Sequence, residues 1–234
     1  MDLWIVRHGE PIYGPDTLTD LGRRQAQALA DRFAVHGLHR VYSSPQGRAL
    51  ETAEPTAQRL GLPVTVLPWV REVWPEMTLP QPDGSRRFVM DMPGTLYRSD
   101  EAIGLGEKWY AMDCLAGSQA RETFAYVAEE SDRFLAELGY RREGGVYRVT
   151  APNEERIAVF CHAGLTLSCW LPHLMAIPPH LFWAAFDLTH SGVTLLHWEN
   201  SPSGYTAPKC LLLSDMSHIY KADLPFLYNG KLPM

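Results

Sequence analysis

The sequence predicts an α/β protein of three layers, in which helices cover both faces of a mostly parallel sheet. Two observations carry this prediction. Residues 2–67 alternate short apolar runs with helical patterns, in the order strand, helix, strand, helix, strand. The same alternation returns at residues 156–161 (RIAVFC), which indicate a buried strand and precede a further helical stretch.

In the first half of the pattern, the sequence marks where each helix starts and ends. Residues 2–6 predict a buried strand, and Thr17 to Asp20 contain the Thr side chains that cap helix starts. Apolar residues at helical spacing then continue to Gly37, which ends the helix. Residues 39–43 predict a second strand. Ser44 is predicted to cap the next helix, with Pro45 in its first turn. That helix ends at Gly61, and residues 63–67 predict a third strand.

Residues 73–117 interrupt this rhythm. The segment is rich in Pro, Gly, Met and aromatic residues and has no sustained period, so we interpret it as an inserted lid within a single domain of residues 1–234. The elements expected after it are a helix from Ser118, a hairpin at 140–150, a strand at 156–161, a helix at 165–176 and strands at 192–198 and 209–215.

Composition narrows the class of function. The 234 residues are 46% hydrophobic and 21% charged, with a net charge of -6. Such an acidic chain is a poor partner for nucleic acid. Its apolar runs are too short for a membrane span, and its start lacks a signal peptide pattern. The four cysteines form no CxxC pair, which indicates free thiols and favours a cytoplasmic location.

Two of the predicted strands end in histidine. His8 follows the first strand and His162 follows the strand at 156–161, and a glycine comes soon after each, at Gly9 and Gly164. In open parallel sheets, ligands bind beyond the carboxyl ends of the strands. Glycine lets the backbone turn and approach a ligand closely. The two histidines are therefore expected to meet at one site.

The same edge gathers groups that suit a phosphoryl group. Arg7 precedes His8, Arg48 lies in the first turn of a helix, and Glu72 lies just past the third strand. Arginine binds phosphate oxygens with paired hydrogen bonds. A neutral histidine can attack phosphorus, and a carboxylic acid can protonate a leaving oxygen.

These motifs together resemble a known family. RHGE at 7–10, SSPQGRALETA at 43–53, Glu72 and HAG at 162–164 are similar to the histidine phosphatase superfamily, branch 1, whose members are phosphoglycerate mutase-like. LTDLGRRQAQALA at 18–30 resembles the first helix of that family. The resemblance covers the chain apart from residues 73–117, and it implies a phosphoglycerate mutase-like fold.

The resemblance also implies a role for each residue. His8 would be the nucleophile and become a phosphohistidine. Glu72 would protonate the leaving alcohol and then activate water. His162 would act in catalysis as a second, protonated clamp. The phosphate-binding positions implied are Arg7, Arg48, His162, Gly9 and Ala163. No metal and no cofactor is expected, because the cationic side chains already neutralise the phosphoryl charge.

Some assignments stay open at this point. Glu76 lies one turn beyond Glu72, and Glu10 is close to the nucleophile, so each is an alternative general acid. Ser43 is a candidate phosphate contact. The histidines of the late strands, His190, His197 and His218, are expected to be structural, with His218 a candidate support for the site.

Hydrolysis is the favoured activity. Mutases of the family read RHGxSxxN, whereas this chain has Pro11 and Gly14 at the Ser and Asn positions. We therefore expect a phosphomonoester hydrolase acting on a small phosphorylated metabolite. The alternatives are phosphoglycerate mutase-type transfer and a catalytically silent phosphate-binding module. An aromatic, Met-containing surface near the insertion is suited to a homodimer contact.

Overall fold

A six-stranded sheet lies at the centre of the computed structural model, which describes residues 1–81, 83–225, 227–228 and 232–233. The strand order is β13-β11-β1-β10-β4-β5. The β1–β10, β10–β4 and β4–β5 pairs are parallel, and β1–β11 and β11–β13 are antiparallel. The sheet is therefore mostly parallel, as predicted, with an antiparallel edge.

The strands of this sheet and of the smaller ones have the following bounds. The central strands are β1 (Asp2–Arg7), β4 (Arg40–Ser43), β5 (Val64–Val66), β10 (Arg156–Cys161), β11 (Val193–His197) and β13 (Lys209–Asp215). A three-stranded sheet contains β8 (Tyr140–Glu143), β9 (Val146–Val149) and β12 (Tyr205–Thr206). The short pairs are β2 (Pro11–Ile12) with β3 (Thr17–Leu18), β6 (Thr78–Pro80) with β7 (Arg86–Phe88), and β14 (Leu227–Tyr228) with β15 (Leu232–Pro233).

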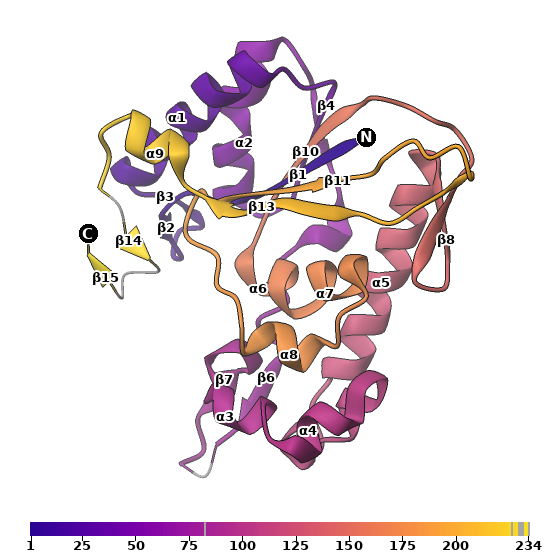
Figure 1. The fold of residues 1–234 in the computed structure, drawn as a ribbon. Helices are drawn as coiled ribbons and strands as arrows, with labels where there is room; N and C mark the ends of the chain where they lie inside the picture. The colour runs from indigo at the N-terminus through magenta and orange to yellow at the C-terminus, as the bar shows by residue number, and fades with distance from the viewer. Residues whose placement is uncertain (82, 226, 229–231, 234) are drawn as a thin grey trace.

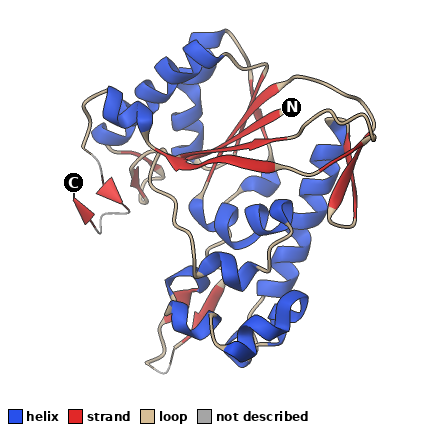
Figure 2. Ribbon diagram, viewed as in Figure 1, coloured by secondary structure: helices blue, strands red, loops and turns tan. Residues whose placement is uncertain are grey.

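Helices flank both faces of the central sheet (Figures 1 and 2). On one face lie α1 (Asp20–His36), α2 (Gly47–Leu60) and α9 (Ser217–Lys221). On the other lie α5 (Ala120–Glu137), α6 (Ala163–Leu165) and α7 (Leu171–Met175). Helices α3 (Gly94–Tyr97) and α4 (Asp100–Leu105) come before α5 in the chain, and α8 (Pro179–Trp183) follows α7. This arrangement is the three-layer α/β/α fold that the sequence predicts.

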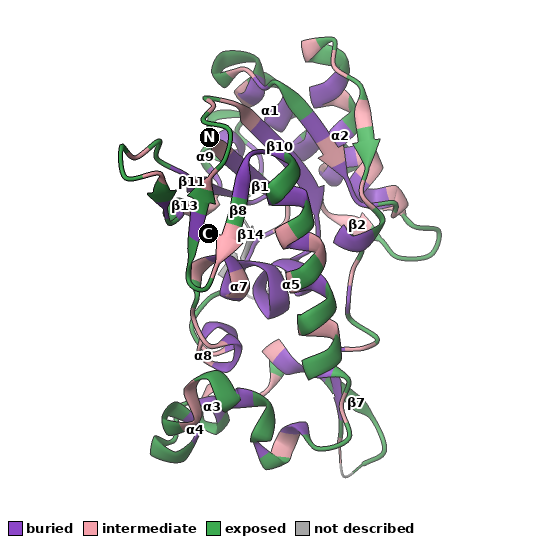
Figure 3. Ribbon diagram, turned by 90° about the vertical axis from the view of Figure 1, so that its right-hand side faces the viewer, coloured by how far each residue is buried: buried purple, intermediate pink, exposed green. Residues whose placement is uncertain are grey.

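The alternation along β1 explains why helices are needed on both faces. Leu3 and Ile5 belong to the larger hydrophobic core, on the α5 side, whereas Trp4 and Val6 belong to the core shared with α1 and α2. Successive side chains of a strand point to opposite faces, so an unbroken apolar run fills two cores at once. The burial view agrees: β1 and β10 at the middle of the sheet are buried, and the outward face of α5 is exposed (Figure 3).

Three predicted helix boundaries differ from the structure. Helix α2 begins at Gly47 rather than directly after Ser44. The Ser44 hydroxyl accepts from the Gln46 N–H at 3.2 Å, just before the helix, and is also bonded to His162. Helix α5 begins two residues after Ser118. The helix predicted at 165–176 runs over 163–175 and contains a π-helical turn at Thr166–Trp170.

Pro172 accounts for that π-helical turn. Proline has no backbone N–H and so cannot donate to the carbonyl four residues earlier. That carbonyl belongs to Ser168, and it accepts instead from the indole Nε1 of Trp183 at 3.2 Å. The Ser168 carbonyl therefore keeps a hydrogen-bond donor despite Pro172, and the bond from Trp183 joins α8 to this helix.

The segment 73–117 packs onto the same hydrophobic core as the sheet. Its buried residues Phe88, Tyr97 and Trp109 belong to the larger core cluster. The rings of Tyr97 and Trp109 lie 5.3 and 5.5 Å from that of Trp183 in α8. Figure 1 shows β6, β7, α3 and α4 below α8, on the side of the molecule away from α1.

Within the part of the chain that the structure describes, no helix combines the length and the apolar character needed to cross a membrane.

Candidate active site

His8 lies immediately past β1 and is almost fully buried, with 2% of its surface exposed. Its main chain is held on both sides: the His8 N–H donates to the Cys161 carbonyl at 2.9 Å, and its carbonyl accepts from Ser191 N–H at 3.0 Å. Its Nδ1 donates to the carbonyl of Gly9 at 2.7 Å. Because a carbonyl can only accept, Nδ1 carries the proton and Nε2 holds the lone pair.

His162 lies beside His8, with 5.2 Å between the ring centroids. Its Nδ1 accepts from a guanidinium N–H of Arg48 at 3.1 Å, and its Nε2 donates to the hydroxyl of Ser44 at 2.8 Å. Burial, together with the charges of Arg48 and Arg7, holds the pKa of His162 well below its usual value. The expectation of a protonated His162 therefore differs from the structure, in which the neutral ring is favoured.

Arg7 and His190 form a contact that the sequence does not predict. One Nη of Arg7 donates to Nε2 of His190 at 2.8 Å, and the His190 ring lies 5.6 Å from the His8 ring. Burial and the charge of Arg7 lower the pKa of His190 to about 3, so the neutral ring accepts this bond. His190 is therefore part of the site and not only structural. The sole sequence signal is its position just before β11, the antiparallel neighbour of β1.

Glu72 faces the site, and the two alternative acids do not. The Glu72 carboxylate accepts from the N–H groups of Val73 and Leu165, both at 2.9 Å. Burial raises its pKa above the usual value, against the opposing effect of these bonds and of the nearby arginines. Glu76 instead pairs with Arg71 at 2.5 Å, and Glu10 accepts from the Thr19 hydroxyl at 2.7 Å.

The loop between β2 and β3 provides Asp16, which fixes Arg48. Its carboxylate accepts from an Nη of Arg48 at 2.6 Å and from the Gly47 N–H at 2.7 Å, at the start of α2. Arg48 therefore joins Asp16 to His162. Gly9, expected to contact phosphate, uses its N–H to donate to the Thr52 hydroxyl at 3.0 Å. A phosphate contact through this N–H would have to displace that bond.

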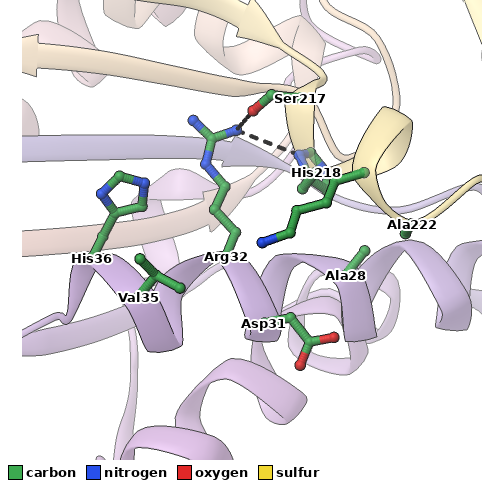
Figure 4. A pocket seen from close by; sticks show the side chains of 9 residues that line it. Ala28, Asp31, Arg32, Val35, His36, Ser217, His218 and Ala222 are labelled. Atoms are coloured by element: carbon green, nitrogen blue, oxygen red, sulfur yellow. Dashed lines mark hydrogen bonds between the residues drawn. The ribbon is translucent and has the colours of Figure 1, made fainter.

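A chain of hydrogen bonds connects His8 to the side of the sheet that α1 and α9 cover. Ser191, which bonds to the His8 carbonyl, is bonded through its hydroxyl to Nε2 of His218 at 3.0 Å. The other nitrogen of His218 faces Arg32, which also binds Ser217 (Figure 4). Arg32 is also ion-paired with Asp215. Arg32, Ser217 and His218 border a cavity of about 300 Å³ between α1 and α9. His218 thus supports the His8 segment, as expected.

A cavity of about 320 Å³ opens beside Arg7 and Glu72. Arg7, Glu72, Ala163 and Gly164 lie on its inner side, and its remaining lining residues are Tyr13, Trp74, Phe88, Met90, Asp91, Phe186 and Asp187. A neighbouring cavity of about 670 Å³ shares Tyr13, Glu72 and Trp74 and also exposes Arg48. Of the residues predicted for phosphate binding, Arg7 and Ala163 line the first cavity and Arg48 lines the second, whereas Gly9 and His162 line neither.

The described residues contain no group of three or more His, Cys, Asp or Glu side chains able to hold a metal ion. The site instead combines a neutral histidine nitrogen, two guanidinium groups and a carboxyl group whose pKa is raised. Such a set can bind a phosphoryl group, attack it and deliver a proton to the leaving oxygen.

Comparison with known proteins gives the family. The sequence model of the histidine phosphatase superfamily (branch 1) matches residues 3–86. A protein of Yersinia pestis named "Probable phosphoglycerate mutase GpmB" is 32% identical over 240 residues, with 97% of each chain covered. The chain belongs to the histidine phosphatase superfamily. A protein of the same name from Proteus mirabilis is 22% identical, covering 86% of this chain and 87% of its own.

Solved structures of this superfamily share the fold. Mycobacterial glucosyl-3-phosphoglycerate phosphatase complexed with VO3 has a TM-score of 0.60 and 20% identity, covering 92% of this chain and 99% of its own. Phosphoserine phosphatase of Entamoeba histolytica, in complex with 3-phosphoglyceric acid, has a TM-score of 0.59 and 18% identity, covering 93% and 98%. At these identities the likeness concerns the fold. The phosphoglycerate mutase-like architecture expected from the sequence is therefore confirmed.

Proposed function

We propose that this protein is a metal-independent phosphomonoester hydrolase that works through a phosphohistidine on His8. The observation that carries the proposal is the hydrogen bond from Nδ1 of His8 to Gly9, which leaves the lone pair on Nε2, beside His162 and within the charges of Arg7 and Arg48. Burial and these neighbouring groups keep the pKa of His8 well below its usual value, so the nucleophilic neutral form predominates.

The reaction has two displacements. Nε2 of His8 attacks phosphorus as the bond to the leaving oxygen breaks, and Glu72 gives its proton to that oxygen. Water then attacks the phosphohistidine, Glu72 takes the proton of the water, and the P–N bond breaks to release phosphate. Arg7 and Arg48 balance the charge of the phosphoryl oxygens in both steps. A bound phosphate dianion would also favour a protonated His162, which then becomes a third donor.

A generic aryl phosphate tests this proposal. We expect 4-nitrophenyl phosphate to be hydrolysed in the presence of EDTA by the parent protein and not by His8→Ala. Intact mass after a rapid alkaline quench, which preserves the acid-labile P–N bond, should show one added phosphoryl group on the parent chain only. Phosphate binding without turnover in the parent would instead support a silent phosphate-binding module. Activity retained in His8→Ala would exclude His8 as the nucleophile.

Phosphoglycerate mutase activity is the second candidate. It is favoured by the name of the 32% identical relative. It requires that the phosphohistidine return its phosphoryl group to a second hydroxyl rather than to water. Interconversion of 3- and 2-phosphoglycerate that depends on a bisphosphate primer, and that exceeds phosphate release, would establish it.

We further propose that residues 1–234 act as one domain with 73–117 as its lid, because this segment shares the core of the sheet and lines the cleft through Trp74, Phe88 and Met90. A cytoplasmic location is also proposed. Its support is that Cys114, Cys161, Cys169 and Cys210 are all free thiols, as suits a reducing compartment.

A further inference from the structure

The cleft has a distinct outer wall beyond the residues proposed to hold phosphate. Three large aromatic side chains on this wall are well exposed: Tyr13 at 69%, Trp74 at 50% and Phe186 at 40%. A single exposed aromatic residue needs no explanation. Here three of them, from separate segments of the chain, line one opening whose inner side carries Arg7 and Glu72. Exposed apolar surface gathered around a cavity indicates a ligand-binding wall.

The position of the aromatic wall assigns it to the leaving group. The phosphoryl end of a substrate is fixed by Arg7 and Arg48, so the rest of the molecule must extend toward Tyr13, Trp74 and Phe186. Phe88 and Met90 complete the apolar part of the lining. Aromatic side chains bind flat rings by stacking and edge contacts. The cavity volume of about 320 Å³ lies within the range of small-ligand pockets, roughly 300–1,000 Å³.

The charges on this wall disfavour an anionic leaving group. Among the described residues, the cations that line the two cavities are Arg7, Arg48 and Arg71. Arg71 is paired with Glu76 at 2.5 Å. Acidic groups are present instead: Asp91 is exposed on the wall, and Asp187 lies near Arg7.

Two basic residues of the insertion, Arg86 and Arg98, are directed elsewhere, and the other two, Arg87 and Lys108, line neither cavity. Arg86 donates to the hydroxyl and carbonyl oxygens of Thr78 at 2.6 and 2.8 Å, and Arg98 donates to the Ala184 carbonyl at 3.0 Å. Neither residue lines the two cavities described above. The insertion therefore offers no cation to hold a substrate carboxylate within the described lining, apart from the paired Arg71 at its border.

We propose that the substrate is a phosphate monoester of a ring-bearing, flat leaving group that has no carboxylate and is neutral or carries an amine. This inference rests on the proposed hydrolase function and specifies its substrate class. Trp74, Phe186 and Tyr13 would contact the ring, and Asp91 would face its positively charged substituent.

Three matched substrates test the inference. The phosphate esters of tyramine, 4-cresol and 4-hydroxyphenylacetic acid share a phenolic leaving oxygen and differ in carrying a positive, neutral or negative substituent. We expect kcat/KM to decrease in that order, by about threefold to fivefold per step, as is typical of exposed charge pairs. Asp91→Asn should bring the ratio of kcat/KM for the tyramine ester to that for the cresol ester close to one.

Variants of the aromatic wall provide a second test of the inference. Trp74→Ala should lower kcat/KM for 4-cresyl phosphate by about tenfold, the scale of one aromatic contact, and lower it less for glycerol 1-phosphate, which has no ring. Tyr220→Ala is the matched control, because Tyr220 is an exposed aromatic on α9 and lines neither cavity. Unchanged melting temperatures would show that both variants fold.

The outcomes distinguish a failure of the proposed substrate class from a failure of the proposed hydrolase function. Equal rates on the three esters, or a preference for 3-phosphoglycerate over all of them, would overturn the substrate class and leave the hydrolase intact. No turnover of any ester, with no phosphorylated chain by mass, would overturn the hydrolase and the substrate class together.

Discussion

At the scale of single residues, hydrogen bonds determine which nitrogen of each site histidine carries a proton. His8 donates from Nδ1 to a carbonyl, whereas Nδ1 of His162 and Nε2 of His190 each accept from an arginine. All three rings are neutral in this arrangement, and each arginine gains an uncharged acceptor. An imidazole acceptor holds a guanidinium in place without cancelling its charge, so these two bonds leave the attraction of Arg7 and Arg48 for phosphate intact. The ion pair with Asp16 offsets part of the charge of Arg48.

The raised pKa of Glu72 predicts the pH dependence of turnover. Glu72 must be protonated to act as the acid, so kcat/KM should fall as pH rises through its pKa, while His8 remains neutral because its pKa is lowered. In Glu72→Gln this falling limb should disappear, and kcat on a poor leaving group should drop by about 10²–10⁴. Ionisation of the substrate affects both proteins equally, so a variant that keeps the limb would contradict the assignment.

His190 is predicted to position Arg7. His190→Ala removes one acceptor of the Arg7 guanidinium, and we expect KM and the inhibition constant of inorganic phosphate to rise about tenfold, the value of one charge-assisted hydrogen bond. The effect on kcat should be smaller. His190→Gln retains an acceptor and should restore much of the affinity. A loss confined to kcat in both variants would show that His190 acts in another way.

At the scale of elements, the turn from β10 into α6 brings the carboxylate and the strand end together. A Cβ added to Gly164 would lie 2.2 Å from Oε1 of Glu72 and 2.8 Å from the Phe88 ring. Only glycine allows Glu72 to lie against this helix start, where it accepts from the Leu165 N–H.

Gly164→Ala should therefore displace Glu72 and lower kcat by at least tenfold on a poor leaving group, with a smaller loss on 4-nitrophenyl phosphate, which needs no acid. Gly104→Ala is the control. It lies within α4, where an added Cβ would meet open space, so it should leave activity unchanged and raise stability by up to about 1 kcal/mol. Wild-type kcat in Gly164→Ala would mean that the turn yields and Glu72 keeps its place.

Elements defined by local pattern are predictable from the sequence, and contacts between distant elements are not. The apolar runs of β1 and β10 indicate buried strands, and with them the meeting of His8 and His162 at one edge. Ser44 has the local pattern of a helix cap, and its hydroxyl accepts from the Gln46 N–H at 3.2 Å, but its second partner, His162, lies 118 positions away. His190 lies 183 positions from Arg7, and its role depends on β11 pairing antiparallel with β1. Neither pairing has a local signal.

At the scale of the whole molecule, buried neutral histidines should make the protein sensitive to acid. The pKa values of His8 and His162 lie well below the usual 6.5, and those of His190 and His218 are about 3. Below pH 6.5 the unfolded chain binds protons at these positions and the folded chain does not. Stability is therefore expected to fall as pH decreases from 6.5, by roughly 1 kcal/mol per pH unit for each histidine.

Glu72, whose pKa is raised, opposes this trend by one proton where it titrates. Melting temperatures between pH 7.5 and 5 measure the slope, and His218→Gln should make it shallower by removing one of the four histidines. Saturating phosphate should protect the protein at the lower pH values, because it binds only the folded chain. A melting temperature that does not change over this range would contradict the expected burial of neutral rings.

On the ribosome, β1 emerges long before the two strands that pair with it, β10 and β11. Both strands that flank it in the described sheet, β10 and β11, come after residue 155, in the last third of the chain. Domains normally assemble from the N-terminus during synthesis. Here the segment that carries Arg7 and His8 cannot be placed until β10 has been translated. A product cut short before β10 would contain Arg7, His8, Arg48 and Glu72 and still have no means of gathering them. Premature termination therefore yields an inert chain rather than an uncontrolled phosphate-binding fragment.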